Sequence, residues 1–356
     1  MEISLFTASI VAAKRSNIDN LTMKFIKFIL FKSLVTVVSL SAFGLANSQT
    51  ILRASHQFPG STGDVRDEMI RMIAQEVEAA NVDLVIRVYP GQSLFKATDQ
   101  WSALTRGRLD IALLPLDYAS GRHPEFSATL MPGLVKNHEH ARRLNDSPFM
   151  ADIKSVINSA GARVLADTWL AGGFTSSEQC ILSPTDIEGQ VIRAAGPAFE
   201  RMMVAAGASI TSMPSSEIYT AMQTGVLDAA STSSASFVTF RLHEHSTCLT
   251  APGEHGLWFM YEPVLIGQRT WDRLNTEQQN ALIRAGQNAE EYFFEQAQLL
   301  DTHLEEVFRE AGVSVVHMTE DQANEWRSIA AETSYKVFAE EVSGGAELIQ
   351  KALLVE

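Results

Sequence analysis

Apolar and polar positions in the first half of the chain alternate between short runs and longer periodic stretches. Four short runs, rich in β-branched and other apolar residues, predict strands at residues 51–55, 82–89, 111–114 and 163–166. Between them, apolar residues recur at helical spacing, which predicts helices at 64–80, 98–105 and 138–157. Because strands and helices alternate, we expect an α/β fold with helices on both faces of a sheet.

The second half repeats this pattern. A β-branched pair before Gly196-Pro197 predicts a strand at 191–193, then a turn and a helix with proline in its first turn. We expect residues 229–236 to form a hydroxyl-rich loop, 237–245 a helix, and 258–267 one long apolar strand that connects back to the first domain. Long helices are predicted at 275–311 and 320–341, and the sequence from Thr319 to Gln322 resembles a capped helix start.

Residues before position 49 have the pattern of a secretory signal peptide. Lys24, Lys27 and Lys32 lead into an apolar stretch at 33–45, and small residues follow up to Ser48. The stretch is shorter than the ~20 apolar residues that a membrane span needs. We therefore expect export to the periplasm with cleavage near Ser48. Met23 is a more natural start for this signal than Met1, so residues 1–22 would lie upstream of it.

Composition and charge narrow the possible partners. The 356 residues are 46% hydrophobic and 20% charged, a globular composition long enough for two domains. The formal net charge is −14, whereas phosphate binding requires a basic surface. The charge therefore argues against nucleic acid as a partner and against a charge-driven attachment to a membrane.

The sequence contains two cysteines, Cys180 and Cys248. An even number in an oxidising compartment makes a single disulfide feasible, and both cysteines fall in the expected second domain. Their spacing alone does not show that the two Cα atoms come close enough for a bond. The sequence therefore leaves the pairing open.

Two histidine pairs, His138 with His140 and His243 with His245, raise the question of a metal site. On a helix, residues two apart point to different sides and do not chelate one ion together, so we expect surface histidines and no metal. The sequence contains no G-x-S-x-G, H-E-x-x-H, Walker or G-x-G-x-x-G motif. We expect neither catalytic residues nor a cofactor.

Arg193 is the candidate with the clearest chemistry. It lies at the end of a predicted strand, just before the turn at Gly196-Pro197. An arginine there presents a planar fork of donors, which suits a carboxylate better than the point charge of a lysine. The alternative is an ordinary surface salt bridge, which is the commoner role of an arginine.

The residues around Arg193 carry a long pattern. It runs Val191-Ile-Arg193, Gly196-Pro197, Gly207-Ala208, Met213-Pro214 and Ser216-Glu217-Ile-Tyr219-Thr-Ala-Met-Gln223-Thr-Gly225-Val-Leu-Asp228. This pattern resembles the solute receptors of tripartite ATP-independent periplasmic (TRAP) transporters, the DctP-like family. Segments 103–113 and 137–144 resemble two further stretches of that family, so the resemblance covers the chain from about Thr50 onward.

The resemblance implies a two-domain periplasmic binding protein of type II-like fold, with connecting strands and a long helix that bridges the domains. We assign residues 49–170 plus 259–298 to domain I and 171–258 plus 299–356 to domain II. Such a receptor is a monomer that closes on a small organic acid, with Arg193 pairing with the carboxylate. It delivers the acid to the integral membrane subunits of a transporter driven by an ion gradient.

The candidate ligand contacts combine this resemblance with its departures. They are Arg193, Trp169, Phe174, Met213, Ser215, Ser231, Thr232 and Gln57. Relatives often carry a second basic residue where this chain has Phe174-Thr-Ser-Ser, and Ser215 and Thr232 stand in place of an aromatic residue and an asparagine. Hydroxyl groups suit hydroxy or keto groups, so we expect monocarboxylates to be preferred over C4-dicarboxylates.

Three alternatives stay open at this point. Arg53 or Arg122 would restore dicarboxylate binding if either reached the site. The alternative role of Trp169 is an aromatic side chain that fills the hinge core, and the sequence favours neither role. An exported hydrolase or lyase on a similar scaffold would need a base and a nucleophile close together, and the sequence offers no such pair. A ligand-sensing domain would usually carry an effector region, and none is expected before Glu356.

Overall fold

The structure is a computed structural model that describes residues 49–61 and 63–356. The expected signal peptide, its cleavage site near Ser48 and the alternative start Met23 lie outside these residues. Residues 50–356 form one compact unit. Among the described residues, no helix has the length and apolar character needed to cross a membrane.

The strands follow the predicted alternation. They are β1 (Thr50–His56), β2 (Leu84–Tyr89), β3 (Ile111–Leu113), β4 (Ala162–Ala166), β5 (Trp169–Ser176), β6 (Val191–Ala194), β7 (Ser209–Ser212), β8 (Ala229–Ser233), β9 (Cys248–Thr250), β10 (Trp258–Tyr261), β11 (Val264–Gly267) and β12 (Ser314–Val316).

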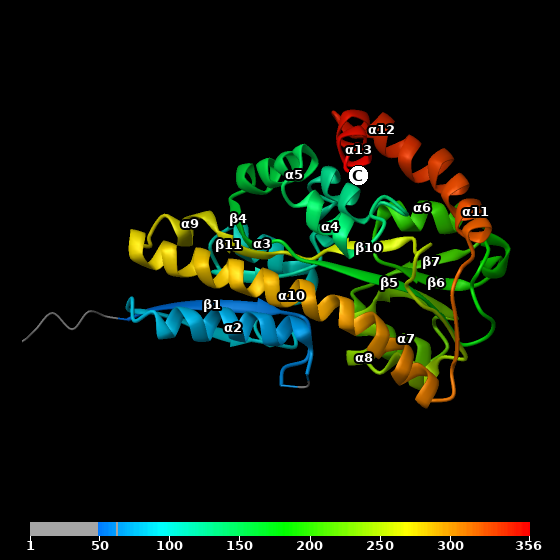
Figure 1. Ribbon diagram of the computed structural model, residues 1–356, viewed down its shortest axis with the longest axis horizontal. Helices are drawn as coiled ribbons and strands as arrows, with labels where there is room; N and C mark the ends of the chain where they lie inside the picture. The colour runs from blue at the N-terminus through cyan, green and yellow to red at the C-terminus, as the bar shows by residue number, and fades with distance from the viewer. Residues whose placement is uncertain (1–48, 62) are drawn as a thin grey trace, which may run out of the picture. The chain divides into compact units, whose positions relative to one another are not determined.

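The helices lie between and after these strands (Figure 1). They are α2 (Val65–Ala79), α3 (Gln100–Thr105), α4 (His138–Leu144), α5 (Pro148–Ser159), α6 (Pro197–Ala205), α7 (Ile218–Gln223), α8 (Ser234–Thr239), α9 (Gln268–Trp271), α10 (Thr276–Glu310), α11 (Glu320–Ala330), α12 (Lys336–Glu341) and α13 (Gly345–Leu353). Shorter helical turns are η1 (Ala97–Asp99), η2 (Leu116–Ala119), η3 (Pro124–Leu130), η4 (Pro184–Ile187), η5 (Ser215–Glu217), η6 (Leu242–His245) and the π-helical η7 (Ala331–Tyr335).

Within the described ranges, the strands form two sheets. The first sheet has the order β2-β1-β3-β11-β4, in which β1 is parallel to β2 and β3 while β11 runs antiparallel to both of its neighbours. The second sheet has the order β12-β9-β5-β8-β6-β7, and β10 also pairs with β5. The expected two-domain α/β architecture is confirmed. The domain boundaries at individual residues stay a prediction.

The predicted single strand at 258–267 is wrong, because Glu262 and Pro263 divide it into β10 and β11. β10 pairs with β5 in the second sheet, whereas β11 pairs with β3 and β4 in the first. A proline has no backbone N–H to donate to a ladder, which explains the break. The chain thus passes between the sheets here and again between β4 and β5.

The predicted loop at 229–236 is also wrong. Residues 229–233 form the fully buried strand β8 between β5 and β6, and Ser234 begins α8. Their short hydroxyl side chains are buried because they bond to the backbone: Ser231 Oγ lies 3.3 Å from the carbonyl oxygen of Arg193, and Ser234 Oγ lies 3.2 Å from that of Ala171. Polarity alone therefore misidentified a central strand.

The long helix α10 contacts elements of both sheets, as Figure 1 shows where it passes from α2 toward α8. Asn275 and Gln278 form a capping box at its start. Leu282 and Phe293 pack in the core beside α2, whereas Phe308 packs in a different core, beside Phe237 of α8. The predicted bridging helix is confirmed.

Gly286 allows α10 to lie directly against the first sheet. A Cβ added at this position would lie 2.1 Å from the carbonyl oxygen of Leu165 on β4, closer than two such atoms can approach. Any side chain here would push the helix away from the strand. This half of α10 is therefore fixed to β4.

The C-terminal helices begin beside the second sheet and end beside the first. α11 packs against α6, whereas α13 packs against α5 and η3. In that second contact, Leu348 and Ile349 share a core with Phe149 and Ile153 of α5. The last helix therefore adds to the core on the side of the first sheet.

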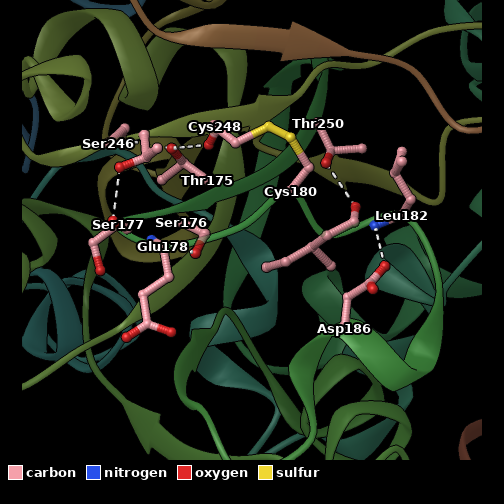
Figure 2. The surroundings of a disulfide bond; sticks show 12 residues. Thr175, Ser176, Ser177, Glu178, Cys180, Leu182, Asp186, Ser246, Cys248 and Thr250 are labelled. Carbon is pink, nitrogen blue, oxygen red and sulfur yellow. Dashed lines mark hydrogen bonds between the residues drawn. A yellow bond between two sulfur atoms is a disulfide. The ribbon is translucent and has the colours of Figure 1, made fainter.

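Cys180 and Cys248 form a disulfide, with their Cα atoms 5.0 Å apart (Figure 2). The bond joins the segment after β5 to the start of β9. Thr250 Oγ1 donates to the carbonyl oxygen of Ile181 at 2.6 Å beside it. The disulfide closes a loop with a sequence separation of 68 residues.

The expectation of surface histidines is wrong for His140. This side chain is buried, its Nδ1 accepts from the Lys136 backbone N–H at 3.1 Å, and its Nε2 lies 3.0 Å from the carbonyl oxygen of Val355. Burial lowers the pKa of His140, which keeps it neutral. The described residues contain no group of three or more histidine, cysteine or acidic side chains placed to hold a metal ion.

Candidate functional site

The carboxyl ends of strands from both sheets meet at one place. Gln57 directly follows β1 and Tyr118 follows β3, whereas Arg193 lies near the end of β6 and Ser215 follows β7. In open α/β sheets, ligands bind at the carboxyl ends of the strands. We call these four residues, with Arg66 and Asp117, the strand-end junction.

Arg193 is almost completely buried, with 1% of its surface exposed. Its Nε donates to the carbonyl oxygen of Met213 at 3.0 Å, and its Nη1 donates to that of Ser231 at 2.7 Å. Burial lowers the pKa of the Arg193 guanidinium, but the ordinary pKa of arginine is so high that the group stays a cation at neutral pH. Two backbone carbonyls of the second sheet therefore fix the head group and its charge.

Tyr118 links Arg193 to the side of the first sheet. Its hydroxyl oxygen lies 3.2 Å from Arg193 Nη2, 3.0 Å from the backbone nitrogen of Ser215 and 3.4 Å from Gln57 Nε2. Ser216 Oγ also lies 3.4 Å from Gln57 Oε1. Residues from both sheets are thus joined through one network of hydrogen bonds.

Asp117 places a carboxyl group beside Arg193. It is buried, and neither of its oxygens has a hydrogen-bond partner. Burial and the charge of Glu200 raise the pKa of Asp117 to about 8, although the positive charge of Arg193 opposes this rise. A Cβ at Gly196 would lie 1.5 Å from Asp117 Oδ2, so only glycine lets η2 approach this closely. Asp117 is therefore protonated in most molecules at neutral pH.

Three junction residues were not identified from the sequence: Asp117, Tyr118 and Arg66. Arg66 comes from the start of α2. It is fully buried, and its guanidinium donates to Asp64 through Nε at 2.9 Å and Nη2 at 2.8 Å. Its Nη1 donates to Ser236 Oγ on α8 at 3.1 Å, and its charged carbon lies 3.5 Å from the centre of the Phe58 ring. In the sequence, Asp64 and Arg66 look like ordinary charged residues at a helix start, so no signal marked them.

Neither Arg53 nor Arg122, the two arginines considered from the sequence, belongs to the strand-end junction. Arg53 pairs with Asp110 at 3.2 Å and its side chain is 42% exposed, and Arg122 is exposed. Arg66 instead comes from the start of α2. Its own charge is already paired with Asp64.

Glu262 lies next to Arg66 at the break between β10 and β11. It is fully buried, its Oε2 is 3.8 Å from Arg66 Nη1, and neither carboxyl oxygen has a hydrogen-bond partner. Burial raises the pKa of Glu262 to about 7, with Arg66 lowering it and Asp64 raising it further. Two buried carboxyl groups without donors, Asp117 and Glu262, therefore lie close to the two arginines.

Of the candidate ligand contacts, Met213, Ser215, Ser231 and Gln57 lie around Arg193 or Tyr118. Met213 and Ser231 contribute backbone oxygens, and Ser215 contributes a backbone N–H. Thr232 is buried on β8 opposite Gly173. Met213 and Ser215 contact Arg193 or Tyr118 through the main chain, whereas Ser231 contacts Arg193 through both its carbonyl oxygen and its hydroxyl group.

Trp169 and Phe174 lie elsewhere. Trp169 Nε1 donates to Asn145 Oδ1 at 2.8 Å, and its ring centroid is 4.9 Å from that of Tyr261. Phe174 stacks on Trp326, with ring centroids 5.7 Å apart, inside a core cluster. The structure records no hydrogen bond or ring contact between either residue and the described junction.

A separate cavity of about 350 Å³ lies beside Trp169, between α4 and α10. Its lining includes Glu290, which accepts hydrogen bonds from the Asp167 backbone at 2.9 Å and from Asn145 Nδ2 at 3.2 Å. Burial raises the pKa of Glu290 to about 7. None of the residues that line this cavity belongs to the strand-end junction.

The sequence and the fold agree with a known family. The sequence model of the bacterial extracellular solute-binding proteins, family 7 (DctP), matches residues 60–341. The chain belongs to the DctP family. A solute-binding protein of Albidiferax ferrireducens is 38% identical over 315 residues, which cover 87% of this chain and 93% of the relative. The resemblance found in the sequence is thereby confirmed.

Solved structures of DctP-type proteins superpose on this chain. A TRAP periplasmic solute-binding protein from Rhodoferax ferrireducens with bound malonate has a TM-score of 0.82 and 38% identity, over 85% of this chain and 96% of the other. A TRAP protein from Sulfurospirillum deleyianum with bound succinate, at 23% identity, has a TM-score of 0.78 over 87% of this chain and 100% of the other, and shows the shared fold. This DctP protein is therefore a solute receptor of the TRAP type.

Proposed function

We propose that this receptor captures a small organic acid in the periplasm, with the acid's carboxylate paired to Arg193. The supporting observation is the buried guanidinium of Arg193, held by the carbonyl oxygens of Met213 and Ser231. A cation that is fixed before the ligand arrives loses little freedom on binding. In a site with little water, its attraction for a carboxylate is stronger than at an exposed surface.

Binding would bring together the two proposed domains, residues 49–170 plus 259–298 and residues 171–258 plus 299–356. The closed receptor, a monomer, would then present a surface to the integral membrane subunits of a TRAP transporter, which an ion gradient drives. The receptor itself would catalyse no reaction. Export would depend on the signal peptide before Ser48.

Two observations bear on the kind of acid: the ligand of a relative and the charges at the junction. The relative from Rhodoferax ferrireducens holds malonate, a short acid with two carboxylates. Arg66 is already paired with Asp64, so it offers no uncompensated charge to a second carboxylate. We therefore keep the preference for monocarboxylates, such as hydroxy, keto or sugar acids, as our prediction, with malonate as the first dicarboxylate to test.

Calorimetry with malonate, succinate, malate, glucuronate, lactate and pyruvate tests this proposal. We expect at least one acid to bind, and Arg193→Ala to weaken it by about 2–5 kcal/mol because a buried carboxylate loses its partner. Arg193→Lys should weaken binding as well, since the fork of donors is lost. Arg201, a half-buried arginine on α6, provides the matched control through Arg201→Ala.

Three outcomes would contradict the proposal in different ways. If no acid bound, the receptor function for organic acids would be wrong. Unchanged affinity in Arg193→Ala would remove Arg193 from the site, and tight binding of dicarboxylates alone would overturn the monocarboxylate preference. Recovery of the acid unchanged after incubation distinguishes a receptor from a hydrolase or lyase.

A further inference from the structure

Three N–H donors converge on the hydroxyl oxygen of Tyr118. The Ser215 backbone N–H is 3.0 Å away, Arg193 Nη2 is 3.2 Å away and Gln57 Nε2 is 3.4 Å away. One of these donors is a buried cation and another belongs to a backbone at the start of η5. This set of donors is unusually rich for a neutral phenol oxygen, which has two lone pairs.

The same donors suit a carboxylate oxygen better than a hydroxyl oxygen. Hydrogen bonds with an ionised donor or acceptor are shorter and about twice as strong as those between neutral groups, and an acid would make the acceptor ionised for all three donors. The remaining Arg193 donors, Nε and Nη1, are directed at the carbonyl oxygens of Met213 and Ser231. Nη2 carries two N–H groups, so an acid that pairs with Arg193 on the side facing Tyr118 shares Nη2 with the tyrosine hydroxyl or displaces that hydroxyl.

We propose that the Tyr118 hydroxyl occupies the position of a ligand carboxylate oxygen and is displaced when an organic acid binds. The inference rests on the proposed function and adds a residue that sets its affinity. Tyr118 is half-buried and lies in the short turn η2, next to Asp117, so its ring belongs to the edge of the junction and not to a core. Its hydroxyl keeps the three donors paired, and the acid must compete with it.

This competition separates Tyr118 from the other junction residues. Removing a group that contacts the ligand weakens binding, whereas removing a competitor strengthens it. In Tyr118→Phe the three donors lose their acceptor while the ring stays. Leaving buried donors unpaired is unfavourable, so the free receptor is destabilised relative to the complex.

Calorimetry of Tyr118→Phe with malonate, or with whichever acid of the panel binds the natural protein most tightly, tests the proposal. We expect the affinity to rise by about 5- to 30-fold, with the melting temperature measured in parallel. Tyr219→Phe is the matched control, because its hydroxyl bonds to Glu244 at 2.7 Å at an exposed position, and it should leave the affinity unchanged. Unchanged or weaker binding in Tyr118→Phe would overturn the proposal.

A second measurement uses the natural protein and does not depend on the folding of a variant. N-acetylimidazole acetylates accessible tyrosine hydroxyls, and peptide mass spectrometry reports the extent at Tyr118. Displacement predicts that the bound acid increases acetylation of Tyr118 and leaves Tyr219 unchanged. Protection of Tyr118, or no change, would contradict displacement while the receptor function stands. If no acid binds, both proposals fall.

Discussion

Arg66 of α2 donates to Ser236 of α8, with 3.1 Å between Nη1 and Oγ. Arg66 packs on Phe58 beside the first sheet, whereas Ser236 follows a strand of the second. The pair is fully buried, so water does not replace either partner. The Ser236 hydroxyl therefore accepts a hydrogen bond from the charged Arg66 side chain, and this bond joins the two halves of the chain.

Ser236→Ala should destabilise the protein, because the Nη1 group of Arg66 then keeps only Glu262, 3.8 Å away. We expect a loss of about 1–3 kcal/mol in the free energy of unfolding, measured by denaturant titration. Ser328→Ala on α11 is the control, since its hydroxyl bonds only within its own helix, to the carbonyl oxygen of Asn324, at an exposed position. Equal stability of both variants would show that the contact contributes nothing measurable.

Phe174→Leu should lower stability without changing the affinity for an organic acid. Phe174 stacks on Trp326 in a packed core, and a smaller side chain leaves part of that space empty. Losses of about 1–3 kcal/mol are usual for such changes. Thermal unfolding and calorimetry on one preparation check this prediction, and a large drop in affinity at normal stability would return Phe174 to the ligand site.

The contribution of Asp117 to the stability of the protein should fall as pH rises from about 4 to about 8. The pKa of Asp117 is raised to about 8, whereas an unfolded aspartate titrates near 3.9. Between these values the folded protein keeps a proton that the unfolded chain has lost, so raising the pH favours unfolding. Denaturant titrations over this range should show the slope.

Asp117→Asn is the matched test of that pH dependence, since asparagine has the same shape and does not titrate. The variant should show a flatter profile and gain stability relative to the natural protein at pH 8, but not at pH 4. Asp321→Asn, on an exposed position of α11, should leave the profile unchanged. Identical slopes in all three proteins would assign the pH dependence to other groups, of which Glu262 is the first to examine.

Reduction of the disulfide between Cys180 and Cys248 should destabilise the receptor. Closing a loop of this length lowers the entropy of the unfolded chain, which stabilises the folded protein by about 4 kcal/mol. The melting temperature should fall on addition of dithiothreitol, whereas the Cys180→Ser, Cys248→Ser double variant should be insensitive to it. A melting temperature that dithiothreitol does not change in the natural protein would contradict the prediction.

The sequence predicted most elements because their signals are local. The apolar period of α10, the capped helix start at Thr319 and the Gly196-Pro197 turn each act within a few residues, and each is confirmed. The loop expected at 229–236 failed for a non-local reason: its serines are buried because distant carbonyl groups, such as that of Arg193, bond to them. When the hydrogen-bond partners of polar side chains are unknown, polarity alone predicts that these side chains are exposed.

The candidate site shows the same limit. Arg193 was identified because a long pattern surrounds it, and Gln57 and Ser215 do lie near it. Arg66 carries no such pattern, and its burial depends on Ser236, 170 positions away along the chain. Phe174 was predicted as a ligand contact from its position in the sequence. Side chains alternate along a strand, however, and that of Phe174 points into the core.

The attachment of α10 at both ends has a mechanical consequence. Gly286 fixes one half to β4, and Phe308 anchors the other half in the core beside Phe237. A continuous helix of 35 residues is a stiff rod about 50 Å long. Any movement that separates the two sheets must bend this rod or detach one end. Elastic energy in the bent helix would then restore the original arrangement without requiring a flexible loop as the hinge.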